Sequence, residues 1–168
     1  MEKIGFFEEW EIRECIKRIE TLFDTGIFQR RNMGNPFVRS AFIETIVCLR
    51  DLLYKAERHA TRVSFKDDVI ETDKVKDVTD LVVYVRNAVC HINSDNHYVV
   101  PGRVRVTFNI VYGQGDIAVD GEILRCEYPD DVCFGIGKQR VYLRRHIARA
   151  LREAKEQLIP LIGSSFGS

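Results

Sequence analysis

The stretch VRNAVCHINSD, Val85 to Asp95, carries an arginine and a histidine inside a segment that is otherwise largely apolar. Hydrophobic residues in and before it recur at intervals of three and four, the period of an α-helix with one buried face. They are Val78, Leu81, Val82, Val85, Val89 and Ile92. We therefore predict a helix here, with Thr72 or Asp73 as its N-terminal cap.

Helical geometry predicts where the two polar side chains point. At about 100° per residue, Arg86 lies roughly 100° to one side of Val85 and His91 roughly 120° to the other, so the two diverge by about 140°. The rest of the outer face holds Val83, Asn87 and Cys90. Because this face is too apolar for water alone, we expect a second copy of the chain to cover it across a two-fold axis. This predicts a homodimer through the helix, the third of the chain, with a site composed of residues from both copies.

Three other segments show the same helical period. The first covers 9–24, the second covers 38–56 after a capping Asn35, and the last covers 143–158. Long helices joined in this order pack well as an antiparallel bundle of about four.

Between the third and the last helix the hydrophobic residues alternate, as on a strand with one buried face. The alternating residues are Val104, Val106, Phe108 and Ile110. A GQGD turn signal follows them, so we predict a β-hairpin or small antiparallel sheet over about 98–136. The expected fold is mainly α, a single domain over 1–162 with this β insertion before the last helix, followed by a disordered tail at 163–168.

Composition limits the class of protein. The chain has 168 residues, of which 45% are hydrophobic and 30% charged, and this is typical of a globular protein. Its formal net charge is +0, so nucleic acid would have to be attracted by a local basic surface. The first residues are acidic where a signal peptide is apolar, and no run approaches the ~20 apolar residues that span a bilayer. We expect a cytoplasmic protein with no membrane association.

Cysteine and histidine usage argues against a metal centre. Five cysteines without a CxxC pair predict reduced, mostly packed thiols. The four histidines are scattered and the acidic residues lack ligand spacing, so we expect no metal site and no cofactor. His59 and His146 stand alone on predicted helices, and we expect structural roles for both.

The segment RNAVCH, Arg86 to His91, resembles the R-x4-H motif of the HEPN superfamily (higher eukaryotes and prokaryotes nucleotide-binding). That superfamily consists of bundles of four or five helices with the motif near the end of a late helix. The resemblance extends more loosely to 8–95 and 140–160. It implies a dimeric, metal-independent endoribonuclease, as in toxin, antiphage and CRISPR-associated systems, with an antitoxin or regulatory protein as a further partner. Two features depart from the pattern: Asn93 stands where a frequent toxin subgroup has tyrosine, and the β segment matches no subgroup.

These residue types suit the cleavage of RNA without a metal. The reaction needs a base for the 2′-hydroxyl proton, an acid for the leaving 5′-oxygen, and positive charge beside the phosphorane. His91 can serve as acid or base, because histidine titrates near neutral pH. Arg86 can stabilise the phosphorane, because its planar guanidinium matches phosphate oxygens. Asn87 can orient the histidine or contact the phosphate.

Further residues are candidates for binding RNA. His97 and Tyr98 follow the motif closely and can line the cleft, His97 as a second titrating group and Tyr98 as a ring on which a base stacks. Three arginines of the last helix share a face at i, i+4 and i+7, and can follow an RNA backbone. They are Arg145, Arg149 and Arg152.

Each of these residues also has a plain structural interpretation. Arg86 can pair with Asp80 or another surface acid, and His91 can cap the carbonyl groups at a helix end. The arginines of the last helix can form a solvated charged face. The alternative function is therefore a non-catalytic dimeric protein that binds a partner, a nucleotide or RNA.

Overall fold

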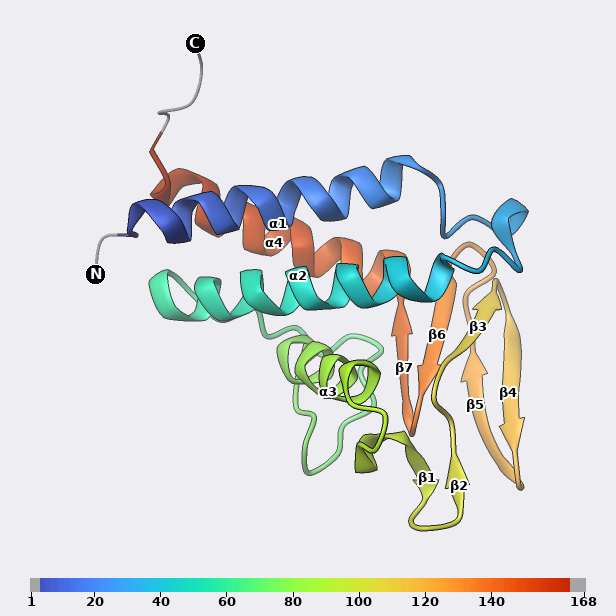
Figure 1. The fold of residues 1–168 in the computed structure, drawn as a ribbon. Coiled ribbons are helices and arrows are strands. Elements are labelled where there is room, and N and C mark those ends of the chain that lie inside the picture. Colours follow the sequence, from blue (N-terminus) through green and yellow to red (C-terminus); the bar gives the residue numbers. More distant parts are fainter. Residues whose placement is uncertain (1–3, 164–168) are drawn as a thin grey trace.

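The computed structural model describes residues 4–163, and in it the helices gather at one side of the molecule and the strands at the other (Figure 1). The helices are α1 (Phe6–Asp24), α2 (Val38–His59), α3 (Val78–Cys90) and α4 (Arg149–Leu158), with a π-helical turn, η3 (Leu143–Ala148), leading into α4. Short 3-10 turns are η1 (Arg30–Asn32), η2 (Asp95–His97) and η4 (Ile159–Leu161). The strands are β1 (Tyr98–Val100), β2 (Val104–Arg105), β3 (Asn109–Tyr112), β4 (Gly115–Val119), β5 (Glu122–Cys126), β6 (Val132–Ile136) and β7 (Gln139–Tyr142).

This is a mixed α/β fold, so the prediction of a mainly α bundle with one inserted hairpin was wrong. Seven strands form three separate antiparallel sheets, β1–β2, β3–β6–β7 and β4–β5. The GQGD signal covers the turn after β3 and the first two residues of β4, but these strands do not pair with each other, and β3 pairs with β6. The tight turns lie elsewhere, at Asp120–Gly121 between β4 and β5 and at Gly137–Lys138 between β6 and β7. β7 itself lies outside the predicted β range.

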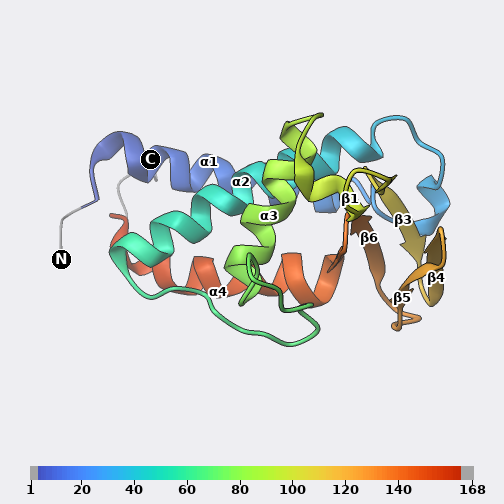
Figure 2. The same cartoon turned by 90° about the horizontal axis from the view of Figure 1, so that it is seen from below.

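The four helices do pack together, with α2 in contact with α1, α3 and α4. Figure 1 shows α2 between α1 and α3, and Figure 2 shows α3 crossing α2. The apolar residues that recur at the helical period along α2 are all buried: Val38, Phe42, Ile46, Leu49, Leu53 and Ala56. The helical period therefore identified the inner face of this helix correctly, because that face is covered along its whole length.

The helix α3 is shorter than predicted at both ends. It begins at Val78, and its N-cap is Asp77, whose carboxylate accepts a hydrogen bond from the Asp80 N–H at 2.9 Å. It ends at Cys90, and His91 has extended backbone angles, φ −125° and ψ 105°. Ile92 was predicted to lie on the buried stripe, but it is 78% exposed. The Asn-Ser-Asp sequence that follows favours a turn, so the helix ends before Ile92 can reach the core.

Helices and strands share one hydrophobic core. The ring of Phe134 in β6 lies 4.3 Å, centroid to centroid, from that of Phe42 in α2. Phe108 lies 5.3 Å from Phe42 and 6.1 Å from Phe134. The expectation of one domain over 1–162 stays a prediction, and residues 164–168 of the predicted tail lie outside the described residues. No helix within residues 4–163 is long and apolar enough to cross a membrane.

A buried carboxylate, that of Asp131, caps the start of η3. It accepts hydrogen bonds from the backbone N–H groups of Arg144 at 2.9 Å and Arg145 at 3.2 Å, and from that of Val132 at 2.8 Å. The Arg145 guanidinium also donates to it at 3.1 Å. Free N–H groups at a helix start need such partners, so Asp131 ties the β5–β6 connection to the last helix.

His146 also stabilises η3, through hydrogen bonds of both ring nitrogens. Its Nδ1 accepts a hydrogen bond from the Tyr142 N–H at 3.1 Å, and its Nε2 lies 3.0 Å from the Asp67 carbonyl oxygen. Because a carbonyl can only accept, the proton is on Nε2 and the buried ring is neutral. Burial lowers the pKa of His146 below its ordinary value. This bonding gives His146 the structural role that we expected.

We predict that Asp131→Ala lowers the free energy of unfolding by about 3 kcal/mol, because it leaves buried donors and a guanidinium without their acceptor. Asp130→Ala is the matched control, since that carboxylate is 55% exposed and pairs with the same Arg145. Asp130→Ala should lower the free energy of unfolding by about 0.5 kcal/mol. Urea unfolding of both variants measures these losses, and equal losses in the free energy of unfolding would contradict the capping role.

We also predict that stability falls as the pH drops below 6.5, the ordinary pKa of histidine. The folded-state pKa of His146 is lowered, so below 6.5 the unfolded chain binds a proton that the folded chain does not. His146→Asn keeps an acceptor for the Tyr142 N–H but does not titrate. Urea unfolding between pH 7.5 and about 5 should therefore show a shallower loss in this variant than in the parent protein. Parallel pH profiles would refute the assignment.

Candidate functional site

Arg86 lines a groove of about 390 Å³ where α3 meets α1 and α2. We call it the Arg86 groove, and its lining residues are Trp10, Glu11, Glu14, Cys15, Arg18, Glu44, Val47, Cys48, Arg50, Asp51 and Arg86. All of them except Arg86 belong to α1 or α2. The groove therefore exists because the first two helices pack side by side and α3 lies across α2 (Figure 2).

Two cations, Lys55 and Arg18, contact the four carboxylates of the groove. The buried ammonium of Lys55 binds Asp51, and binds Glu11 at 3.0 Å. Arg18 binds Glu44 at 3.0 Å and lies 3.9 Å from Glu14. Four acids and two cations thus form two ion-pair groups along α1 and α2, in each of which one cation contacts two carboxylates.

Two guanidinium groups of the groove are left without a carboxylate. Within residues 4–163, neither Arg86 nor Arg50 is in a salt bridge with an acidic side chain. Arg86 Nη1 donates only to Asn87 Oδ1, at 3.2 Å, and the Arg50 guanidinium lies 5.2 Å from the centre of the Tyr54 ring. The groove therefore presents two guanidinium groups that no carboxylate binds, and these can donate hydrogen bonds to an anionic ligand.

The structural interpretation of Arg86 as the partner of Asp80 was wrong. Asp80 Oδ1 binds the guanidinium of Arg62 at 2.6 Å, and its Oδ2 accepts from the Lys76 N–H at 3.0 Å. Arg62 also binds Asp77, so the acids at the start of α3 form their own network. Arg86 lies on a later turn of the helix and takes no part in it.

His91 lies past the end of α3 and is exposed. Its ring makes no hydrogen bond or ion pair with another described residue, so it does not cap the helix carbonyls. The backbone beside it is well held: the His91 carbonyl accepts from the Ser94 N–H at 2.9 Å and lies 3.3 Å from His97 Nε2. The Arg105 guanidinium donates to the Ile92 carbonyl. The β segment thus fixes the loop that carries His91.

The structure does not bring Arg86 and His91 together within one chain. Arg86 lines the groove and His91 does not. Asn87 Oδ1 accepts a hydrogen bond from Arg86, and within residues 4–163 Asn87 makes none with the His91 ring. The expectation that two copies of the chain combine Arg86 with His91 stays a prediction.

His97 and Tyr98 differ in burial. His97 is 2% exposed, so it supports the His91 loop from inside the protein. Its Nε2 must carry the proton that it donates to the His91 carbonyl, and its Nδ1 is buried without a hydrogen-bond partner. Tyr98 is half-buried, and the Arg105 guanidinium lies 5.3 Å from its ring centre.

The three arginines near the C-terminus lie apart from the groove. Arg145 binds Asp130 and Asp131 and lies 3.5 Å from the centre of the Tyr128 ring. Arg149 binds Asp67 and Glu153 and stacks on Phe65 at 3.8 Å. Only Arg152 is largely exposed, 3.9 Å from Glu156. Because Arg145 belongs to the π-helical turn, the spacing of an ideal α-helix does not relate it to the other two.

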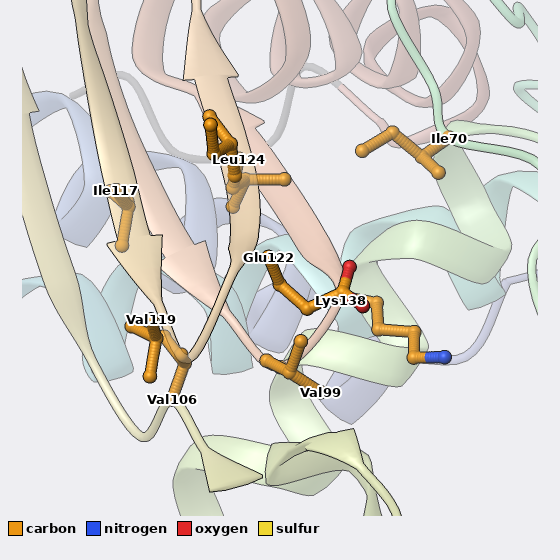
Figure 3. A pocket seen from close by; sticks show the side chains of 10 residues that line it. Ile70, Val99, Val106, Ile117, Val119, Glu122, Leu124 and Lys138 are labelled. Atoms are coloured by element: carbon orange, nitrogen blue, oxygen red, sulfur yellow. The ribbon is translucent and has the colours of Figure 1, made fainter.

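A second pocket, of about 210 Å³, lies among the sheets (Figure 3). Its walls are aliphatic side chains of the β1–β2 and β4–β5 hairpins together with Ile70, and its charged residues are Glu122 and Lys138. Neither arginine nor histidine lines it. This pocket can accept an aliphatic group beside the two charged side chains.

No protein-family model matches the chain, and no curated protein or solved structure is significantly similar to it. Within the described residues, no group of three or more histidine, cysteine or acidic side chains is placed to hold a metal ion. Arg50, which sequence reasoning missed, gave no signal in the sequence, because a single arginine on an amphipathic helix resembles a solvated charge. The candidate site is defined by guanidinium groups that no carboxylate binds and by geometry.

We predict that His97→Phe speeds amide hydrogen exchange at Ser94 about fivefold, the effect of losing one hydrogen bond to the His91 carbonyl. Nuclear magnetic resonance measures this exchange directly. His91→Ala is the control, since its ring holds none of the loop, and it should leave the exchange at Ser94 unchanged. If His97→Phe also leaves it unchanged, His97 does not support the loop.

Proposed function

We propose that this protein is a metal-independent endoribonuclease that acts as a homodimer. Arg86 and Asn87 bind the scissile phosphate, and His91 of the other copy transfers a proton. The observation that carries this proposal is the pair of guanidinium groups, Arg86 and Arg50, that no carboxylate binds in a groove whose acids contact Lys55 and Arg18. The R-x4-H motif at Arg86 to His91, which resembles that of HEPN ribonucleases, supplies the type of reaction.

The groove suits a phosphodiester. A guanidinium donates two parallel hydrogen bonds to phosphate oxygens, and Asn87 holds the Arg86 fork from one side. Arg50 lies on the neighbouring helix, so it can bind an adjacent phosphate of the same strand. Positive charge beside the reacting phosphate stabilises the phosphorane, where negative charge accumulates.

Exposed apolar residues around the groove support dimerisation. Trp10 is 53% exposed, Tyr54 is 48% exposed and Val83 is 36% exposed, and they come from α1, α2 and α3 respectively. A two-fold axis across α3 would cover these residues with the same residues of the second copy. Crossing the two α3 helices would bring the C-terminal end of one, with its His91, toward the Arg86 of the other.

We predict that purified protein cleaves single-stranded RNA in excess EDTA, and that Arg86→Ala and His91→Ala each lower the rate at least about 100-fold. Arg50→Ala should mainly weaken RNA binding, by about tenfold. Arg152→Ala, an exposed arginine of α4, is the matched control and should cleave like the parent protein. The proposal fails if the variant lacking both Arg86 and His91 cuts RNA at the parental rate.

Mixing the two inactive variants tests the composite site. A dimer of one Arg86→Ala chain and one His91→Ala chain retains one intact pair, so an equal mixture should recover about a quarter of the parental rate. A site built within one chain would recover none. A protein that forms the dimer but leaves RNA intact would instead be the non-catalytic interaction protein that the exposed apolar face also suits.

A further inference from the structure

We propose that Cys15 and Cys48 form a peroxide-sensitive dithiol that oxidises to a disulfide between α1 and α2. This is a modification site, and it does not depend on the proposed ribonuclease activity. Both cysteines line the Arg86 groove, Cys15 half-buried and Cys48 4% exposed.

The two thiols meet across the contact of the first two helices. The Cys48 thiol hydrogen-bonds to the Cys15 sulfur, and each also lies near a carboxylate oxygen. Cys15 Sγ is 3.8 Å from Asp51 Oδ2, and Cys48 Sγ is 3.6 Å from Glu44 Oε1. Thiol hydrogen bonds are weak. Closing a disulfide therefore gives up little hydrogen bonding.

The surroundings make Cys15 the thiol that reacts first. The hydrogen bond from Cys48 lowers the pKa of Cys15, and Lys55 and Arg18 act in the same direction, against the effects of burial and Asp51. The same hydrogen bond and burial raise the pKa of Cys48, which keeps its proton. Because the thiolate is the nucleophile, the more accessible Cys15 also carries the more reactive sulfur.

The chemistry is a two-step oxidation by hydrogen peroxide. The Cys15 thiolate attacks one peroxide oxygen, forming a sulfenic acid and releasing hydroxide. The Cys48 sulfur then attacks the sulfenic sulfur, the disulfide forms, and the proton of Cys48 leaves with the hydroxyl group as water. Peroxide is reduced by two electrons, and the two thiols are oxidised by two.

A second pair of cysteines provides an internal control. Cys126 and Cys133 also share a hydrogen bond, which lowers the pKa of Cys126 and, together with burial, raises that of Cys133. They are 0% and 1% exposed and are packed against Tyr142. The two pairs thus have similar thiol chemistry and differ in access to the solvent. Peroxide should reach the pair in the groove and spare the pair in the core.

The test uses Cys90→Ser protein, which removes the exposed fifth thiol and keeps both pairs intact. After brief exposure to hydrogen peroxide, the intact mass should fall by two hydrogen atoms. Peptide mapping without reductant should link Cys15 to Cys48, while Cys126 and Cys133 stay free. The pair in the groove should oxidise at least about tenfold faster than the pair in the core.

A second variant identifies which sulfur reacts first. In Cys48→Ser on the same background, Cys15 has no partner, so its sulfenic acid should accumulate and be trapped by a 1,3-diketone. The proposal is overturned if Cys15 and Cys48 both remain thiols after the same exposure has oxidised an equal concentration of free cysteine. It is also overturned if Cys126 and Cys133 form the first disulfide.

Discussion

The contact between Phe42 of α2 and Phe134 of β6 joins the helical and the β parts of this protein. Their rings lie 4.3 Å apart at the centre of a core to which both parts contribute. The next residue, Gly135, lets the β4–β5 hairpin cover the other face of β6, since a Cβ there would lie 2.5 Å from the Ile117 side chain. β6 is therefore buried on both faces, and the helices cannot pack as a bundle independent of the sheet.

That double burial explains which elements could be predicted from the sequence. α1 and α2 each bury one face, so their apolar residues follow the helical period. The strand VCFGI lies inside the predicted β range, but it has apolar residues or glycine at every position and no alternation, so the sequence did not indicate which strands it pairs with. The capping of η3 by Asp131 depends on a contact between segments more than ten residues apart, and no local pattern indicates it.

Only part of the candidate site could be predicted from the sequence. Arg86 and Asn87 stand out because they interrupt an apolar helix, whereas Arg50 lies among other charged residues of α2. Its importance arises from tertiary pairing, because Lys55 and Arg18 bind the neighbouring acids and two guanidinium groups remain without a carboxylate partner. With Lys55 included, the groove has four acidic and four basic side chains, so a phosphate would meet two guanidinium groups that no carboxylate binds and no net positive charge.

The end of α3 at Cys90 changes how Arg86 and His91 are related in space. An angle calculated at 100° per residue holds for Arg86, which is inside the helix, but not for His91, which is past its end. Helix packing sets the position of Arg86, whereas His97 and Arg105 of the β segment set that of the loop carrying His91. A change in the packing of the β segment would therefore move the imidazole of His91, while the guanidinium of Arg86 stayed in place.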